Sequence, residues 1–245
     1  MDATFTSPYM YWVGMDTDGA SDTQLEEFNR FYNDVHMHEV VAMNPGFVRA
    51  HRYELAKPDP RGDFGPRWLA VYEMADQLAA ATYSARNDGP PKGRPTYTPV
   101  PDVWRENAKT RWRIIWHQIA EAGSLAEPPY SLFLVGINPP TGASEADLDE
   151  FNEFYTNVHV GEVMAASNYG RGTRWEQSRA FLHPDPGCPR YLANYEADDM
   201  TGKELETNPP SGPRSLSVGP VVWQEHSTPW RLVYNRVHSY TPGEE

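Results

Sequence analysis

The chain repeats itself, and this repeat constrains the fold more than any other feature of the sequence. Residues 19–40 read GASDTQLEEFNRFYNDVHMHEV, and residues 142–163 read GASEADLDEFNEFYTNVHVGEV. The offset between the two segments is a constant 123 residues. A unit of that length is far longer than the repeat of a solenoid protein. The pattern therefore predicts a duplicated globular domain.

Four further blocks recur downstream in the same order. Residues 49–54 match 171–176, 68–73 match 191–196, 101–104 match 220–223, and 112–116 match 230–234. A hinge is expected near residues 122–129, where Gly, Ser and two Pro interrupt the apolar pattern. We therefore predict a first repeat at residues 1–124, which is the candidate active half, and a second repeat at residues 125–245.

Local patterns predict the elements of each repeat. Ser21 is a suitable helix N-cap, apolar residues follow it at helical spacing, and Asn44-Pro-Gly ends the helix. Ser144 with Asp147 gives a similar cap in the second repeat. Strands are expected at residues 9–14, 47–55, 67–73 and 111–119, with a second helix at 75–86 and a proline-rich loop at 87–101. The resulting order, βαββαβ, is that of a ferredoxin-like unit.

A family resemblance rests on these motifs. The first helix carries Phe-Tyr-x-x-Val-His-x-x-Glu-Val at residues 31–40, and Asn-Pro-Gly-Phe and a strand Arg-x-x-Arg-Tyr-Glu follow. This pattern resembles the dimeric α+β barrel superfamily, and within it the EthD-like branch. The second repeat departs from it, with Ala-Ser-Asn-Tyr-Gly at residues 166–170 where the first has Met-Asn-Pro-Gly-Phe. The resemblance implies an α+β fold in which two ferredoxin-like βαββαβ repeats form one intrachain α+β barrel.

Composition excludes several classes of protein. The net charge of −13 opposes binding to nucleic acid and to anionic membranes. The single cysteine, Cys188, excludes an intramolecular disulfide framework, and no run approaches the roughly 20 apolar residues of a membrane span. No secretory signal pattern is present at the start. We expect a cytoplasmic protein that binds neither nucleic acid nor membrane, and a homo-oligomer of the fused barrel stays open.

One stripe of the first helix carries candidate catalytic residues. Tyr32, His36 and Glu39 lie at i, i+4 and i+7, and the second repeat keeps the same three residue types. The trio lies towards the end of the helix, where the helix dipole would favour a protonated imidazole and make His36 a candidate acid. The structural alternative is that His36 only stabilises the helix end and that Tyr32 and Glu39 only bond to it.

Differences between the repeats are a second indication of chemistry. His38 is replaced by Gly161, and His51 is replaced by Thr173. Histidine titrates near neutral pH and suits proton transfer, so His38 is a candidate base and His51 a further candidate. His51 shares one strand face with Arg49 and Tyr53, and the sequence leaves open which face looks inward. Either histidine could also be an ordinary surface or packing residue.

No cofactor or metal is predicted. His36 and His38 lie two residues apart on a helix and point to nearly opposite sides, so they would not chelate one ion. No glycine-rich phosphate loop and no serine elbow occurs. The thiol of Cys188 lies in a predicted loop and is interpreted as incidental. Haem remains an alternative, because haem-active enzymes are among the members of the resembled superfamily.

Aromatic residues fall on the predicted strands. With eight Trp and fourteen Tyr, the chain has either large aromatic cores or an aromatic cavity. We favour a cavity that binds an apolar or aromatic small molecule in the first half of the barrel. Its expected substrate-binding residues are Trp12, Tyr53, Trp68, Trp112 and Trp116.

These observations lead to three alternative functions. The first is a cofactor-independent enzyme of lyase, isomerase or cyclase type, which acts on a hydrophobic or aromatic small molecule by general acid–base chemistry. The second is a non-catalytic small-molecule binding protein with the same cavity. The third is a haem-dependent or metal-dependent oxidoreductase. The sequence favours the first.

Overall fold

A computed structural model of the chain describes residues 5–88, 94–185, 187–207 and 216–244. Residues 89–93 of the predicted proline-rich loop lie outside this part. The strands are β1 (Tyr9–Thr17), β2 (Phe47–Lys57), β3 (Trp68–Met74), β4 (Ala108–Gly123), β5 (Ser131–Asn138), β6 (Arg171–Leu182), β7 (Tyr191–Ala197) and β8 (Ser227–Tyr240). The helices are α1 (Asp22–Phe31), α2 (Met37–Met43), α3 (Gln77–Asp88), α4 (Asp102–Asn107), α5 (Glu145–Phe154), α6 (Val160–Ser167), α7 (Asp199–Thr207) and α8 (Val221–Gln224). Two π-helical segments, Tyr32–His36 and Tyr155–His159, join α1 to α2 and α5 to α6.

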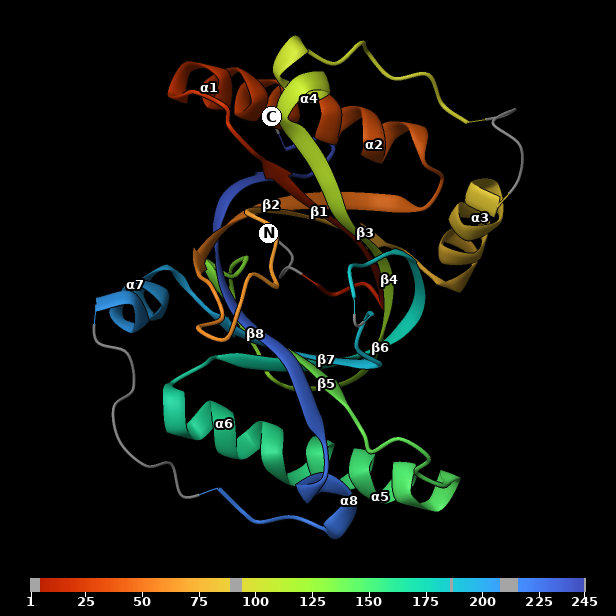
Figure 1. Ribbon diagram of the computed structural model, residues 1–245, viewed down its shortest axis with the longest axis vertical. Coiled ribbons are helices and arrows are strands. Elements are labelled where there is room, and N and C mark those ends of the chain that lie inside the picture. Colours follow the sequence, from red (N-terminus) through yellow and green to blue (C-terminus); the bar gives the residue numbers. More distant parts are fainter. Residues whose placement is uncertain (1–4, 89–93, 186, 208–215, 245) are drawn as a thin grey trace.

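The strands form one closed antiparallel barrel within the chain, which confirms an α+β barrel. Their order around the barrel is β1-β3-β2-β8-β5-β7-β6-β4, and β4 pairs with β1 to close it. The first half supplies β4-β1-β3-β2 and the second supplies β8-β5-β7-β6, the same spatial order. The halves meet where β2 pairs with β8 and where β4 pairs with β6. Helices α1, α2 and α4 cover one side of the barrel and α5, α6 and α8 the opposite side (Figure 1).

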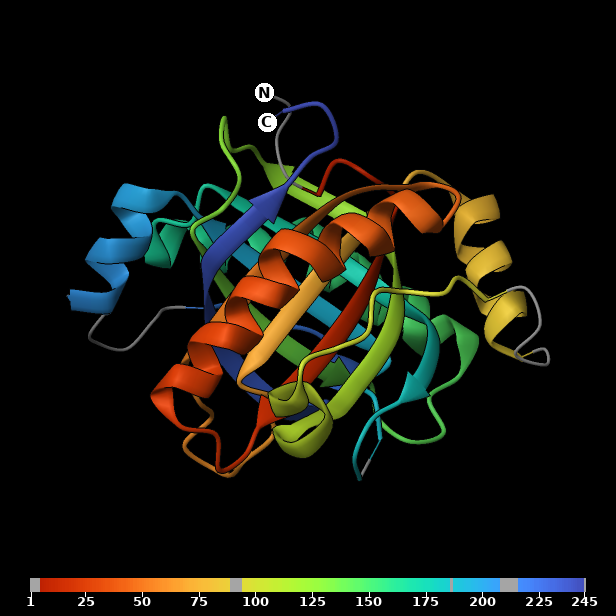
Figure 2. The ribbon, with the colours of Figure 1, turned by 90° about the horizontal axis from the view of Figure 1, so that it is seen from above.

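The helix starts are formed as the sequence predicts. The side chain of Ser21 accepts a hydrogen bond from the backbone of Gln24, and the side chain of Gln24 accepts one from the backbone of Ser21. Ser144 and Asp147 form the same capping box in the second half. From the first cap, α1, the π-helical turn and α2 run as one rod across the strands (Figure 2).

The turn after α6 explains why the second half lacks the Pro-Gly motif. In the first half, Gly46 has φ +83°, and a Cβ there would lie 2.3 Å from the Cβ of Ala79. In the second half the left-handed position is taken by Asn168, with φ +57°. Asparagine tolerates this conformation better than most residues with a side chain. The two sequences therefore turn the chain by different means.

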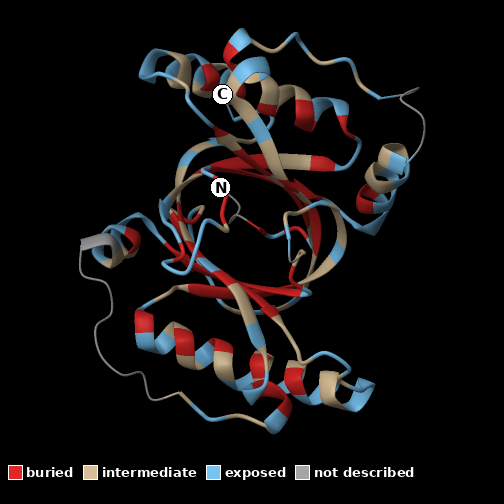
Figure 3. Ribbon diagram, in the orientation of Figure 1, coloured by how far each residue is buried: buried red, intermediate tan, exposed pale blue. Residues whose placement is uncertain are grey.

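Three apolar cores hold the barrel together, and the buried faces of the strands and helices meet in them (Figure 3). One core lies under α1 and α2, and one under α5 and α6. The third, here called the barrel core, fills the inside of the barrel. Its largest side chains are Tyr53, Trp12, Trp112, Trp116, Trp175, Trp230 and Tyr234. No helix in the described part of the chain has the length and apolar character needed to cross a membrane.

Candidate functional site

Cavities lie between the helices and the outer face of the barrel in both halves. The His36 cavity has a volume of about 180 Å³ and is lined by residues that include Tyr32, Tyr97 and Trp104. The His159 cavity has a volume of about 400 Å³, and its lining includes Tyr155 and Trp223. The two cavities occupy corresponding places, because Tyr32 and Tyr155, His36 and His159, and Trp104 and Trp223 are equivalent pairs in the repeated blocks.

A π-helical turn positions each histidine. The backbone N–H of Met37 bonds to the carbonyl of Tyr32, and that of Val160 bonds to the carbonyl of Tyr155. This i→i+5 pattern is rare and occurs often at functional sites. It places the rings of Tyr32 and His36 with centroids 5.1 Å apart, and the equivalent pair in the second half 5.2 Å apart.

Both cavity histidines are neutral at pH 7. Burial lowers the pKa of His36 to about 4, although Glu39 opposes the shift. Burial likewise lowers the pKa of His159 to about 4, although Glu162 opposes it. In each ring Nδ1 is buried and has no hydrogen-bond partner among the described residues. A neutral imidazole with an unpartnered nitrogen can accept a proton.

The interpretation of His36 as a protonated acid at a helix end is therefore wrong. The helix continues past His36 through α2 to Met43, and it ends where Asn44-Pro-Gly predicts. The negative end of the dipole consequently lies almost two turns further along. Desolvation of the imidazole then dominates its pKa, and it favours the neutral form.

Glu39 has another role than the expected assistance to His36. Its carboxylate accepts hydrogen bonds from the backbone N–H of Thr98, at 3.1 Å, and from the Thr98 hydroxyl, at 2.6 Å. Glu162 accepts the same two bonds from Ser217, at 3.1 and 2.5 Å. Each glutamate thus fixes a loop beside a cavity. It acts on the histidine only through its charge.

The structure does not bring the other predicted catalytic histidines to this site. The ring of His38 stacks on Tyr240, with centroids 3.7 Å apart. His51 faces the inside of the barrel, where its Nε2 lies 3.3 Å from Glu73 and its Nδ1 lies 2.9 Å from the hydroxyl of Ser239. Burial lowers the pKa of His51, against the opposing effect of Glu73. Their catalytic roles stay predictions, separate from the cavities.

The aromatic residues expected to bind substrate lie mainly in the barrel core. Trp12 packs on Trp112 and Trp116, with ring centroids 6.3 and 5.7 Å apart. Tyr53 is in the same core, which shows that its strand face looks inward. Trp68 faces the other way, under α1, and donates a hydrogen bond to Thr17 at 3.1 Å. None of these five lines a cavity described here.

Other residues of the cavities were not singled out by the sequence. Trp104 packs on His36, with centroids 4.9 Å apart, and Trp223 packs on His159 at 4.5 Å. Both belong to the repeated Pro-x-Val-Trp block. The recurrence of this block in both repeats could have indicated that the two tryptophans are site residues. His226 also lines the His159 cavity and stacks on Trp223 at 4.3 Å. No pattern in the sequence indicated it.

The two halves differ in the hydrogen bonds of one arginine side chain that both contain. Arg113 donates hydrogen bonds to the hydroxyl of Tyr11, at 2.8 Å, and to Asn87, at 2.7 Å. The corresponding arginine, Arg231, pairs with Val135 of β5, two residues from Phe133, which lacks the hydroxyl. Its guanidinium has no hydrogen bond or ion pair with the described residues. The second half therefore presents an unneutralised cation in a larger cavity.

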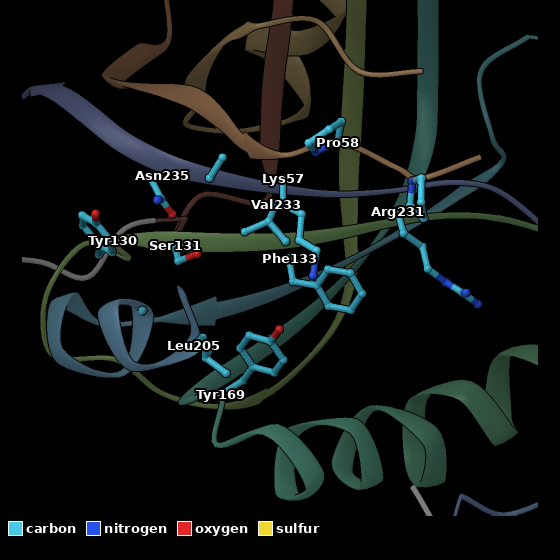
Figure 4. A pocket seen from close by; sticks show the side chains of 13 residues that line it. Lys57, Pro58, Tyr130, Ser131, Phe133, Tyr169, Leu205, Arg231, Val233 and Asn235 are labelled. Carbon is cyan, nitrogen blue, oxygen red and sulfur yellow. The ribbon is translucent and has the colours of Figure 1, made fainter. Parts of the chain in front are cut away.

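The His159 cavity adjoins a second one, here called the outer cavity. It has a volume of about 790 Å³, and both cavities are lined by Phe133 and Arg231. Figure 4 shows Phe133, Tyr169 and Leu205 gathered on the side of the sheet that faces α6 and α7.

Among the described residues, no three His, Cys, Asp or Glu side chains converge to hold a metal ion.

Comparisons with known proteins bear on the fold. No family model matches the sequence, and no curated protein matches it. An anthrone oxidase-like protein of known structure superposes with a TM-score of 0.55 at 10% identity, over 98% of this chain and 95% of that one. A presumed chlorite dismutase superposes with a TM-score of 0.50 at 12% identity, over 94% of each chain. A presumed monooxygenase from Lactobacillus acidophilus superposes less well, with a TM-score of 0.43 at 11% identity, over 96% of this chain and 99% of that one. The chain thus shares its α+β barrel fold with the first two of these structures.

Proposed function

We propose that the chain is a fused pair of ferredoxin-like repeats of the EthD-like type, divided at residues 124 and 125. The five matched sequence blocks support this, as does the identical strand order of the two halves. In a fused barrel each repeat keeps its own cavity between helix and sheet. One cavity is then free to diverge from the other.

The proposed activity is general-base catalysis on an aromatic small molecule, without a cofactor. The neutral imidazole of His159 accepts a proton from an O–H or acidic C–H bond of the substrate. The electron pair of that bond stays on the substrate as an oxyanion or enolate, and Arg231 stabilises its charge. Return of the proton to another atom completes an isomerisation, and loss of a leaving group completes an elimination.

One observation carries this proposal: a buried, neutral histidine shares a cavity with an unneutralised arginine. Arg231 lies near enough to contribute to the lowering of the pKa of His159. The aromatic lining of the cavity, from Phe133, Tyr155 and Trp223, suits a planar ring. Aromatic walls with a few polar groups are typical of small-molecule sites.

Cavity size favours the second half as the principal site. The sequence pointed to the first half, where His36 and Tyr32 remain candidates, but its cavity is less than half as large. Arg113 is also already bonded there. We therefore propose His159 as the principal base and His36 as a second base for a smaller ligand. A binding protein without catalysis is the alternative that uses the same two cavities.

A haem-dependent oxidoreductase is a further alternative. The neutral imidazole of His159 is the kind of side chain that binds haem iron in globins and peroxidases. His159 would hold the iron, and haem would supply redox chemistry that the side chains lack. An absorption spectrum and a metal analysis of the purified protein test this alternative, since bound haem absorbs strongly in the visible range.

Proton exchange tests the proposed activity directly. Anthrone is a suitable probe, because its methylene group is acidic and one protein with this fold is anthrone oxidase-like. The protein is expected to accelerate exchange of that methylene group with D2O, measured by NMR. His159→Ala should slow the exchange by about 10²-fold or more. His117→Ala, outside both cavities, is the control. If neither His159→Ala nor His36→Ala slows exchange by about tenfold, the assignment of the base is wrong.

A further inference from the structure

The outer cavity is built differently from the His159 cavity. Its walls come from the outer face of β5 and β8, from α7, and from the chain that follows β2. Apolar and aromatic side chains form part of it, namely Tyr130, Phe133, Tyr169, Leu205 and Val233. At about 790 Å³ it is roughly twice as large as the His159 cavity. A ligand could extend through both cavities past Phe133.

The described side chains that line the outer cavity carry positive charge, although the protein as a whole is strongly acidic. Among the described residues, its lining includes Lys57 and Arg231 and no Asp or Glu, although the chain carries a net charge of −13. The nearest carboxylate by sequence, Asp59, is already engaged. It bonds to the side chain of Arg61 at 2.5 Å and accepts the backbone N–H of Arg231 at 2.8 Å. The guanidinium of Arg231 is left available to a ligand.

Side chains fill the corresponding space beside the first half, from α3 and β1 of that half and from β6 of the second. Tyr83 of α3 packs on Tyr11 with centroids 4.6 Å apart, and Phe181 lies 6.2 Å from Tyr83. In the second half, α7 presents Gly202 and Leu205 to the cavity. The larger space is therefore a specific property of the second half. It accompanies the loss of the hydrogen bonds that hold Arg113.

We propose that the outer cavity binds the anionic part of an aromatic acid, a carboxylate or sulfonate held by Arg231 and Lys57. The aromatic ring of the same ligand would then lie against Phe133 and reach the His159 cavity. This inference rests on the proposed function and adds the substrate class to it. A planar anion suits the fork of an arginine side chain, and a lysine adds a second positive charge.

A matched pair of fluorescent probes tests the inference. 1-Anilinonaphthalene-8-sulfonate and N-phenyl-1-naphthylamine share one ring system and differ in the sulfonate. The wild-type protein is expected to bind the sulfonate at least tenfold more tightly than the neutral probe. Arg231→Gln and Lys57→Gln together should remove most of this preference and change binding of the neutral probe by less than about twofold. Lys109→Gln, an exposed cation on β4, is the matched control and should change neither affinity.

Equal loss of both probes in the double variant, or an unchanged preference for the sulfonate, would overturn the inference. A second variant, Leu205→Trp, fills the outer cavity from α7 and should abolish binding of the sulfonate probe at this site. It should leave anthrone exchange dependent on His159, because anthrone carries no anionic group. If His159→Ala slows exchange but the double variant keeps the preference for the sulfonate, His159 is the base and the aromatic-acid site is wrong. If the double variant loses the preference but His159→Ala does not slow exchange, the aromatic-acid site is supported and the assignment of His159 as base is wrong.

Discussion

The Nε of Arg113 donates a hydrogen bond to the hydroxyl of Tyr11 across neighbouring strands, at 2.8 Å. This bond fixes the guanidinium against the sheet in the first half. Phe133 stands at the corresponding place beside Arg231, since both Tyr11 and Phe133 pair with equivalent tyrosines, Tyr72 and Tyr195. The Tyr11 hydroxyl and Asn87 thus hold Arg113, and among the described residues Arg231 has neither hydrogen bond.

Substitutions at Tyr11 and Phe133 should change how firmly Arg113 and Arg231 are held. Tyr11→Phe is expected to lower the free energy of unfolding by about 1–2 kcal/mol, because it removes a hydrogen bond to a charged group. Phe133→Tyr should weaken binding of the anilinonaphthalene sulfonate severalfold, because its hydroxyl would compete for Arg231. Urea denaturation and fluorescence titration measure the two effects. Tyr9→Phe, whose ring stacks on His117, is the control and should change neither.

The pH dependence of stability should reveal the two cavity histidines. Their pKa is about 4 in the folded protein and near 6.5 in an unfolded chain. Between these values the unfolded chain binds protons that the folded protein does not, so their contribution to stability is lost as the pH falls below about 6.5. The free energy of unfolding should therefore decrease from pH 7 to pH 5, and less steeply in His36→Gln and His159→Gln. An equal slope in both variants and in the control His38→Gln would contradict the low pKa values.

The fold could be predicted from the sequence because repeated blocks constrain many positions at once. The constant offset, the capping serines and the apolar runs on the strands fixed the order of elements in both halves. Boundaries were less accurate: β4 extends to Gly123, beyond the predicted end at residue 119. The short helix α4 was missed, since only six residues lie between a proline and a strand. Such a turn has little hydrophobic periodicity.

The candidate site was predicted only in part, for reasons of tertiary structure. The repeated Tyr32 and His36 do face a cavity. The π-helical turn beneath them leaves no trace in residue spacing. The expected protonated imidazole was wrong, because burial of the ring favours its neutral form. Alternation along β2 grouped His51 with Tyr53 but could not tell which face looks inward. The availability of Arg231 depends on side chains of other elements, which a single sequence does not place.

The loops beside the cavities should loosen when their glutamates are removed. Glu162→Ala deletes the acceptor of both hydrogen bonds from Ser217, and Glu39→Ala deletes that of Thr98. Loss of a charged acceptor should accelerate hydrogen exchange of the Ser217 or Thr98 amide by about tenfold or more. NMR-detected exchange measures this at each residue. Glu150→Ala on the exposed side of α5 should leave both amides protected as in the wild type.

Two buried glutamates inside the barrel should differ in how much stability they lose on substitution by glutamine. Glu73 accepts hydrogen bonds from the backbone N–H groups of Phe5, at 2.9 Å, and Ser7, at 3.2 Å, and it contacts His51. Burial alone would raise the pKa of Glu73, but these partners together lower it. At the equivalent place in β7, burial raises the pKa of Glu196 to about 8 and outweighs Arg171, which lies 3.4 Å away.

Glu73 is therefore charged at pH 7, while Glu196 is largely protonated. Glu73→Gln removes a buried charge on which several donors converge, and it should lower the free energy of unfolding at pH 7 by about 2–3 kcal/mol. Glu196→Gln replaces a neutral acid by a neutral amide and should cost less than about 1 kcal/mol. As the pH rises from 7 to 9, the unfolded chain keeps Glu196 ionised while the folded protein must release its proton. Wild-type stability should then fall relative to Glu196→Gln, because the unfolded chain binds fewer protons than the folded protein in this range. Urea denaturation at pH 7 and pH 9 measures both variants. A Glu196→Gln variant as destabilised as Glu73→Gln at pH 7 would mean that Glu196 is ionised and paired with Arg171.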